Sequence, residues 1–382
     1  MSDSLQIPLP AVIRSRQHLA SQGVNSPPHA GSAPTSLPIS ANGTTYGMAQ
    51  EATWLDSTHF AVGRWDGSLS IFSFNDSKTA GPVITKAINT PAFEGVQSIT
   101  RLAHGVFACS NDDASLCVWS TQGRLWSELE AVALPYPKEW GAANSGDAFV
   151  AEDVLFFVAG HANGFVSIWQ GSPDATNLRL QGAIELRNPD PTNPWGLHNI
   201  RGVSAIRLDD MPSCVVTGSE DGYLCILRVT DGAVLSRTVY NSSAQRGINS
   251  VAAAGRRLLV ANCSVGPDDK NLWYYEIDSG DWSIHLKDSA NLRVDPNAPQ
   301  VFNFCTKWGR FDDAPCFFSS TEEGILWMGQ FNSADRLALL GSQLVYGHLG
   351  SALAFHPSGN LVVVNYNLYQ FGVPTGLRAR ER

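Results

Sequence analysis

Two histidines are the side chains best suited to acid–base chemistry in this chain. Loops from separate parts of the chain are expected to bring His161 and His198 together with acidic turn residues, and an imidazole beside a carboxylate can act as a general base or hold a metal ion. The chain contains no Gly-x-Ser-x-Gly elbow, His-Glu-x-x-His helix, phosphate-binding glycine loop or dinucleotide fingerprint. A hydrolase-type site that uses His161 or His198 is therefore kept as the alternative to a binding function.

Two tryptophans on proline-rich segments favour binding instead. Trp140 lies in LPYPKEWG (residues 134–141), and Trp195 lies in NPDPTNPWG (residues 188–196). A tryptophan on a proline-stiffened loop offers a large rigid contact surface that loses little conformational entropy on binding. The competing interpretation is that each tryptophan fills a gap against a neighbouring part of the fold.

Arginines recur at similar places in the sequence. Arg201 begins RGVS and Arg246 begins RGIN, in each case where a strand is expected to start, and Arg64 precedes Trp65 in a turn. A guanidinium can bind a carboxylate through two hydrogen bonds, so these arginines either pair with turn acids or bind an acidic peptide. The predicted partner-binding residues are Arg64, Trp65, Trp140, His161, Trp195, His198, Arg201 and Arg246. No cofactor or metal site is predicted.

The element expected to position these residues is a β-hairpin. Residues 215–232, VVTGSEDGYLCILRVTDG, place two apolar runs on either side of an Asp-Gly pair, which is a strong signal for a tight two-residue hairpin turn. Both runs are almost continuously apolar, so both faces of the hairpin must be covered. A single hairpin cannot provide that cover.

Similar hairpins recur along the chain. Their turns are expected at Gly67, Ala114, Gly164, Gly222, Lys270 and Gly324, which lie 47 to 58 residues apart. A four-stranded propeller blade usually takes about 40 to 45 residues. The period therefore indicates blades of slightly greater than usual length.

A seventh unit, YGHLGSALAFHPSGNLVVVNY (residues 346–366), resembles the WD-repeat family. It has a Gly-His pair, a strand with alternating small residues, a His-Pro-Ser-Gly turn and a Val-rich second strand. Trp119 and Trp169 stand where the family has the Trp of its Trp-Asp pair, although the Asp is missing. The resemblance implies an all-β fold, a seven-bladed β-propeller of four-stranded antiparallel blades that commonly binds protein partners on the face carrying the turns.

The resemblance also implies a hydrogen-bonded set in each blade, made of a His, a Ser or Thr, the turn Asp and the Trp. In this sequence His198, Thr217 and Asp221 approach that set, with Leu227 in the Trp position. The chain is accordingly expected to be a divergent member whose blades depend more on packing. The expected function is that of an interaction scaffold or adaptor.

Three regions are expected. Residues 1–43 combine a strand-like run (5–16) with a Ser/Pro/Gly-rich linker, residues 44–375 form the propeller, and residues 376–382 form a basic tail. A ring of blades must be closed, and the last unit runs out of strands after residue 372. Residues 5–16 are therefore expected to supply its outer strand.

The composition limits the classes of partner and the compartment that are expected for this protein. The net charge of −9 and the absence of a basic block argue against nucleic acid. The seven cysteines show no Cys-x-x-Cys spacing and fall in apolar strands, which favours reduced thiols, no zinc site and a reducing compartment. No signal peptide or membrane-spanning stretch is recognisable, so a cytoplasmic protein that binds a protein or peptide, within a multisubunit complex or alone, is expected.

Overall fold

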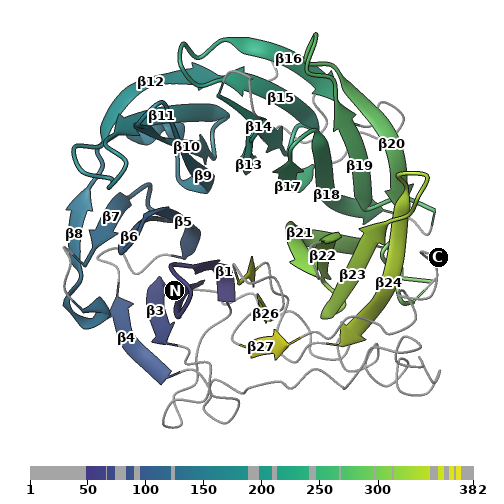
Figure 1. Ribbon diagram of the computed structural model, residues 1–382, viewed down its shortest axis with the longest axis horizontal. Helices are drawn as coiled ribbons and strands as arrows, with labels where there is room; N and C mark the ends of the chain where they lie inside the picture. Colours follow the sequence, from purple (N-terminus) through teal and green to yellow (C-terminus); the bar gives the residue numbers. More distant parts are fainter. Residues whose placement is uncertain are drawn as a thin grey trace, which may run out of the picture.

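The computed structural model describes residues 49–65, 67–73, 83–89, 95–121, 125–187, 198–208, 213–240, 247–265, 268–295, 297–298, 300–311, 314–344, 352–356, 361–364 and 367–370. These residues form antiparallel sheets arranged radially around a central opening, with the first strand of each sheet innermost (Figure 1). This is the β-propeller architecture that the sequence predicts.

The first four blades are separate four-stranded sheets. Their strands are β1 (Ala49–Trp54), β2 (His59–Arg64), β3 (Ser68–Ser73) and β4 (Val83–Asn89); β5 (Val96–Ala103), β6 (Val106–Asn111), β7 (Leu116–Ser120) and β8 (Glu130–Ala133); β9 (Ala143–Ala151), β10 (Val154–His161), β11 (Phe165–Gly171) and β12 (Arg179–Glu185); and β13 (Ile200–Ile206), β14 (Cys214–Ser219), β15 (Tyr223–Arg228) and β16 (Val234–Val239). Two short 3-10 helices, η1 (Trp126–Glu128) and η2 (Lys138–Trp140), interrupt the described connections.

The remaining strands make two more four-stranded blades and a three-stranded sheet. They are β17 (Ile248–Ala254), β18 (Arg257–Val265), β19 (Leu272–Ile277) and β20 (Ile284–Ala290); β21 (Gln300–Phe311), β22 (Ala314–Thr321), β23 (Ile325–Phe331) and β24 (Leu337–Leu344); and β25 (Leu353–Phe355), β26 (Leu361–Val364) and β27 (Asn367–Gln370). The end of β18 also pairs with the start of β21, which links the fifth and sixth blades in one continuous sheet.

Five of the six expected hairpin turns are present, with loops longer than two residues. The connection that holds Lys270, between β18 and β19, includes residues 266–267, which lie outside the described residues. In β14–β15 the pairing stops at Gly218 and Leu224, and the amide of Gly222 donates to the Ser219 carbonyl oxygen at 3.0 Å. Gly222 has a φ of 84°, so the glycine supplies the left-handed residue of a three-residue loop. The same hydrogen bond and a positive φ recur at Gly67, Ala114, Gly164 and Gly324.

Both faces of the hairpin strands are covered because blades pack against blades. Every residue of β14 is buried. Within the described residues, seven clusters of buried side chains fill the spaces between neighbouring sheets. Each sheet thus supplies the cover that its neighbour lacks, and the apolar core forms a ring.

The last described sheet packs against both the first blade and the sixth. β25 packs against β1 through Ala352 and Ala354 on one side and against the β21 blade through Leu353 on the other. The Trp54 indole Nε1 donates to the Ala354 carbonyl oxygen at 3.3 Å. The predicted closing strand at residues 5–16, the linker and the basic tail all lie outside the described residues, so these three domain assignments stay predictions.

Candidate functional site

The inner strands of six blades each contain a β-bulge near the face that carries the hairpin turns. In β1, for example, Ala49 pairs with Arg64 and Glu51 pairs with Gly63, which leaves one residue between them unpaired. The residues at the bulges are Gln50, Gln97, Asn144, Arg201, Asn249 and Phe304. A bulge turns a side chain away from the regular alternation of a strand, and all six residues line the central cavity.

We call these six residues the bulge ring. They form the end nearest the hairpin turns of a cavity of about 960 Å³, which runs along the inner strands. Four of its six members carry side-chain amides, which both donate and accept hydrogen bonds. Gln50 Nε2 donates to Gln97 Oε1 at 3.1 Å, and Asn249 Nδ2 donates to the Asn303 carbonyl oxygen at 2.9 Å. Among the described contacts, the Asn144 amide makes no hydrogen bond.

Arg201 is the charged member of the bulge ring. Its Nε donates to Glu220 in the neighbouring turn, and the side chain is 40% exposed. The sequence aligns Arg201 with Arg246, but this pairing is wrong, because the bulge places Asn249 at the equivalent position of the fifth blade. Arg246 itself lies outside the described residues.

Trp65 is the exposed aromatic residue at the mouth of the cavity. It precedes the turn glycine Gly67, it is 55% exposed, and it lines the same cavity as Arg201. Among the described residues it is the only aromatic side chain that stands out as a large exposed apolar group. Two of the eight predicted binding residues, Trp65 and Arg201, therefore line the same cavity and are accessible.

Two of the predicted binding residues are buried instead. Arg64 is 1% exposed and donates to the hydroxyl oxygens of Ser68 at 2.7 Å and Ser70 at 2.6 Å. His161 is 0% exposed. Neither side chain reaches the surface, so a partner cannot contact them without rearranging a blade.

His161 belongs to a hydrogen-bonded chain inside the third blade. Trp169 Nε1 donates to Ser167 Oγ at 3.0 Å, His161 Nε2 lies 2.8 Å from the same oxygen, and His161 Nδ1 lies 3.2 Å from the Gly141 carbonyl oxygen. One tautomer, protonated on Nδ1, satisfies all three contacts. Burial lowers the pKa of His161 to about 4, against the opposing effect of the Gly141 contact. Ser167 is also fully buried, so this pair offers no open site for a substrate.

Trp140 packs within the same blade. Its ring stacks on Tyr136 and Phe165, with centroids 6.0 and 5.6 Å apart, and meets His161 edge-on at 5.5 Å. The connector backbone is held as well, because the Asn163 amide donates to the Trp140 carbonyl oxygen at 2.9 Å. These contacts favour the gap-filling interpretation of Trp140. Trp195 lies outside the described residues.

His198 lies beside the turn of the fourth blade. Its Nδ1 is 3.6 Å from Asp221 Oδ2, and Asp221 accepts a hydrogen bond from the Ser219 hydroxyl. Thr217 instead donates to the Cys225 carbonyl oxygen at 3.5 Å. The expected set of His198, Thr217 and Asp221 is therefore wrong in one member, since Ser219 takes the place assigned to Thr217.

Farther from the hairpin turns than the bulge ring, the inner strands present two layers of smaller polar side chains. Ser98 and Ser145 donate to carbonyl oxygens of the next blade, at Ala143 (3.0 Å) and Ile200 (3.1 Å). Asp147 accepts from the amide nitrogen of Ala205 in the fourth blade at 2.8 Å. These layers join neighbouring blades around the channel.

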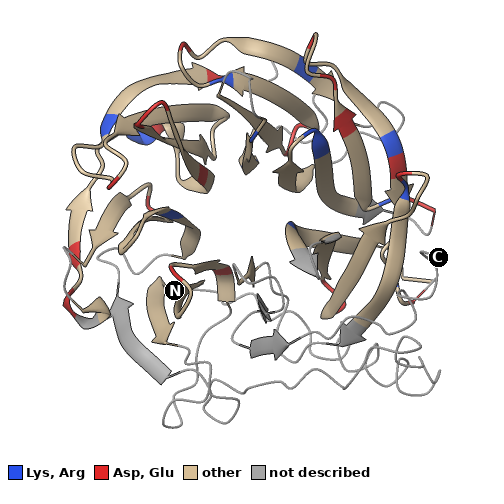
Figure 2. Ribbon diagram, in the orientation of Figure 1, with Lys and Arg blue, Asp and Glu red and all other residues tan. Residues whose placement is uncertain are grey.

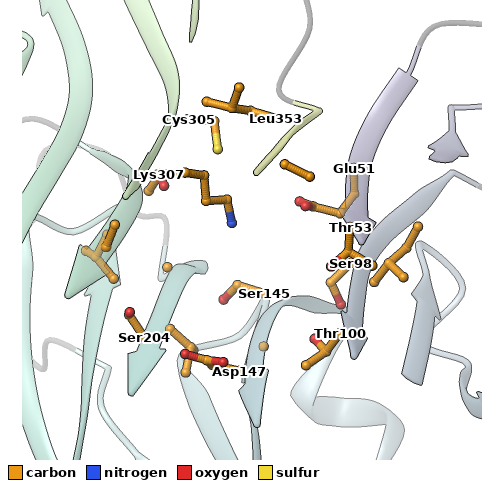
Figure 3. A pocket seen from close by; sticks show the side chains of 18 of the residues that line it. Glu51, Thr53, Ser98, Thr100, Ser145, Asp147, Ser204, Cys305, Lys307 and Leu353 are labelled. Carbon is orange, nitrogen blue, oxygen red and sulfur yellow. The ribbon is translucent and has the colours of Figure 1, made fainter. Parts of the chain in front are cut away.

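Two charged residues replace such small groups, and the sequence reasoning missed both. Glu51 stands where other blades carry Ser98 or Ser145, and Lys307 points into the cavity from β21, facing Glu51 (Figure 3). Burial raises the pKa of Glu51 to about 7, while Lys307 opposes this shift. Burial lowers the pKa of Lys307, but Cys305, Glu51 and Asp147 together raise it above its ordinary value, so the ammonium is charged.

Other site chemistry is limited within the described part of the chain. No three His, Cys, Asp or Glu side chains there come together as a metal site, and the seven cysteines are free thiols. No described helix is both long and apolar enough to cross a bilayer. Basic and acidic residues are interspersed around the ring rather than gathered on one side (Figure 2).

Solved structures share this architecture. The β-propeller domain of Cps50 (Swd1) from Myceliophteria thermophila superposes with a TM-score of 0.60 at 12% identity, over 89% of this chain and 100% of that domain. The WD40 β-propeller domain of Doa1 gives a TM-score of 0.61 at 10% identity, over 90% of this chain and 97% of that domain. The chain folds as a WD40-type β-propeller.

The WD40-type fold of this chain is recognised from the similarity of its structure to solved propellers. No protein-family model and no curated protein sequence matches the chain. This agrees with the missing Trp-Asp pairs and with the internal hydrogen bonds of the third and fourth blades, which differ from the expected set. The propeller keeps the packing of the fold while its polar positions diverge.

Proposed function

We propose that this propeller is an interaction scaffold that binds an extended segment of a partner protein on the face carrying the hairpin turns. The observation that supports the proposal is that Trp65 and Arg201 are both accessible and line the same cavity. Tryptophan and arginine are the residue types most enriched among energetically dominant interface contacts. The Gly67 amide donates to the Arg64 carbonyl oxygen at 3.1 Å across the turn that holds Trp65, which reduces the ordering entropy lost on binding.

The bulge ring suits an extended peptide. Amide side chains match the alternating N–H and C=O groups of a peptide backbone, and Asn144 has its amide available. Arg201 can turn from Glu220 toward an acidic side chain of the partner, since its side chain is 40% exposed. The partner that fits best is therefore a polar segment with an acidic residue.

Of the residues predicted from the sequence, Trp65, Arg201 and His198 remain in this proposal. Trp195 and Arg246 are kept as proposed contacts because their segments adjoin the same turns in sequence. Arg64, His161 and Trp140 are instead assigned a structural role, because their side chains make contacts inside the blades. The hydrolase alternative loses its main support, because His161 is sealed inside the third blade.

The test is affinity copurification with a matched pair of variants, followed by mass spectrometry. Trp65→Ala removes the exposed indole, whereas Leu286→Ala removes an apolar side chain that is 53% exposed on the outer strand β20. Proteins that are retained by wild type and Leu286→Ala and lost with Trp65→Ala and Arg201→Ala identify the partner. Equal retention by all four proteins contradicts a site at Trp65 and Arg201.

A further inference from the structure

Two phenylalanines interrupt the polar character of the bulge ring. Phe304 is the ring member of the sixth blade, at the position where the third and fifth blades carry Asn144 and Asn249. Phe302 lies beside it on β21, and the two rings are nearly parallel, with an interplanar angle of 4° and centroids 5.8 Å apart. Both side chains are half-buried and line the cavity. We call Phe302 and Phe304 the aromatic pair.

The aromatic pair is not part of the apolar core. Three other aromatic residues that line the cavity, Trp54, Trp308 and Phe355, pack into the clusters between blades. Among the described residues, neither member of the aromatic pair belongs to any of the seven clusters. Each ring contacts the other and leaves apolar surface open to the cavity. Burial of this surface by a partner is therefore favourable.

The backbone of β21 holds the aromatic pair in a fixed position. Asn303, between the two phenylalanines, is fully buried, and its Nδ2 donates to the Asn271 carbonyl oxygen at 3.0 Å. The Asn303 carbonyl oxygen accepts from Asn249 Nδ2 at 2.9 Å. The Phe302 amide donates to Glu322 Oε1 at 2.8 Å, and the Phe302 carbonyl oxygen accepts from the Glu322 amide at 2.9 Å. A surface held in this way loses little entropy on binding.

The groups around the aromatic pair favour an uncharged side chain on a peptide backbone. Within the described contacts Asn249 Oδ1 makes no hydrogen bond, so it can accept one from a backbone N–H of the partner. A basic side chain would need a carboxylate beside it. Glu322 already accepts from the Phe302 amide, and Glu51 faces Lys307 across the cavity. An aromatic side chain fits best, because aromatic pairs gain more than their buried area alone provides.

We propose that the partner segment places an aromatic side chain on the aromatic pair while its acidic residue contacts Arg201. This inference rests on the proposed function and names a second recognition element of the same site. A segment that runs from Arg201 in the fourth blade to Phe304 in the sixth passes Asn249 in the fifth, which can bind its backbone. The acidic and aromatic residues of the segment are therefore separated by at least one residue.

The test selects binders of the full-length protein from a displayed library of random short peptides. Peptides whose binding is lost with Trp65→Ala or Arg201→Ala are expected to share an aromatic residue and an acidic one. Phe304→Asn gives the sixth blade the residue type of the third and fifth, and should weaken their binding by about tenfold or more. The control is Leu339→Ala, which removes a 42% exposed side chain on the outer strand β24 of the same blade and should leave binding unchanged.

A double-mutant cycle assigns the contact. Replacement of the aromatic residue of a selected peptide by alanine should weaken its binding to wild type and have little further effect on Phe304→Asn. If Phe304→Asn does not fold, Phe302→Leu keeps an apolar side chain, removes one ring of the aromatic pair and should weaken binding about threefold.

Two results overturn this inference and leave the proposed function standing. The first is equal binding of Trp65- and Arg201-dependent peptides to wild type and to a folded Phe304→Asn or Phe302→Leu protein. The second is a basic or small residue in the peptides where an aromatic residue is expected. If no selected peptide depends on Trp65 or Arg201, the proposed function is contradicted as well.

Discussion

His161 Nε2 lies 2.8 Å from the hydroxyl oxygen of Ser167 in the interior of the third blade. His161→Ala should therefore destabilise the fold by about 2 to 4 kcal/mol, because it leaves the buried Ser167 hydroxyl unsatisfied and removes ring contacts with Tyr136 and Trp140. Urea denaturation measures the change. In a double-mutant cycle, Ser167→Ala should show a coupling of about 1 kcal/mol with His161→Ala; additive effects would contradict the bond.

The lowered pKa of His161 makes the free energy of unfolding depend on pH. Its pKa in the folded protein is lowered to about 4 from an ordinary value of 6.5, so the unfolded chain binds the extra proton between these values. The stabilisation is present above pH 6.5 and is lost as the pH falls toward 4. Wild type should lose about 2 kcal/mol more than His161→Ala between pH 7.5 and pH 5. Parallel pH profiles for the two proteins would argue against the lowered pKa.

The hairpins and their turns were predictable because they depend on local patterns. Apolar runs on either side of a glycine define β14 and β15. The loop length was wrong by one residue, since a three-residue loop with Gly222 at positive φ carries nearly the same sequence signal as a two-residue turn.

The site was harder to predict because it depends on pairing between strands. Arg64 and His161 look like exposed turn residues, but serines on the next strand satisfy them in the blade interior. The positions of the bulges could have been recognised in the sequence. The fragments VQS, ANS, IRG and INS, each with a bulge residue at its centre, occur once per blade in four successive blades. Lys307 could also have been recognised, since it is a single charge within the otherwise apolar or neutral run VFNFCTKW.

Trp140→Ala is expected to act on stability rather than directly on partner binding. The ring stacks on Tyr136 and Phe165, and truncating a packed tryptophan commonly costs about 3 kcal/mol or more. Trp65→Ala, at a 55% exposed position, should change stability by less than about 0.5 kcal/mol. Chemical denaturation of both variants distinguishes the two roles. A Trp140→Ala protein as stable as wild type would return Trp140 to the binding surface.

Ala114 occupies a turn position that other blades give to glycine. Its φ is 63°, and the left-handed region costs a non-glycine residue about 1 to 2 kcal/mol. Ala114→Gly is therefore expected to raise the stability by about 0.5 to 1 kcal/mol, after the larger chain entropy of glycine in the unfolded state is included. Differential scanning calorimetry should show a higher melting temperature.

The reverse change at Gly164 provides the control for that prediction. Gly164 has a φ of 79°, and an added Cβ would lie 2.4 Å from Arg187 Cγ and 3.2 Å from His198 Cβ. Gly164→Ala should lower the melting temperature. If Ala114→Gly also lowers it, the positive φ at Ala114 is not a source of strain.

Removal of residues 1–18 tests the predicted closing strand. The last described sheet has three strands, β25, β26 and β27, and an unpaired outer edge leaves backbone groups open to aggregation. If residues 5–16 complete this sheet, the truncated protein should melt at least several degrees lower or become insoluble. Deletion of residues 376–382 is the control and should have little effect. An unchanged melting temperature without residues 1–18 would contradict ring closure by this segment.

Glu51→Gln tests the electrostatics of the central cavity, where Glu51 faces Lys307 (Figure 3). Burial raises the pKa of Glu51 to about 7 in the folded protein, above its ordinary value of 4.5, so the folded state binds the extra proton between these values. Stability should then fall as the pH rises from 4.5 through 7. Glutamine stays neutral, so Glu51→Gln should match wild type near pH 5 and exceed it by about 1 to 3 kcal/mol at pH 8.

The difference between the two proteins is the quantity to measure, by urea denaturation at each pH. Glu322 also has a pKa raised to about 7 by burial, but it is common to both proteins and cancels. The charged group that lowers the pKa of Glu51 against the effect of burial is Lys307, and the Cys305 thiol also interacts with Glu51. If Glu51→Gln is instead less stable than wild type at pH 8, the ionised carboxylate stabilises the fold through Lys307. The pair would then be a structural link across the channel between the first and sixth blades.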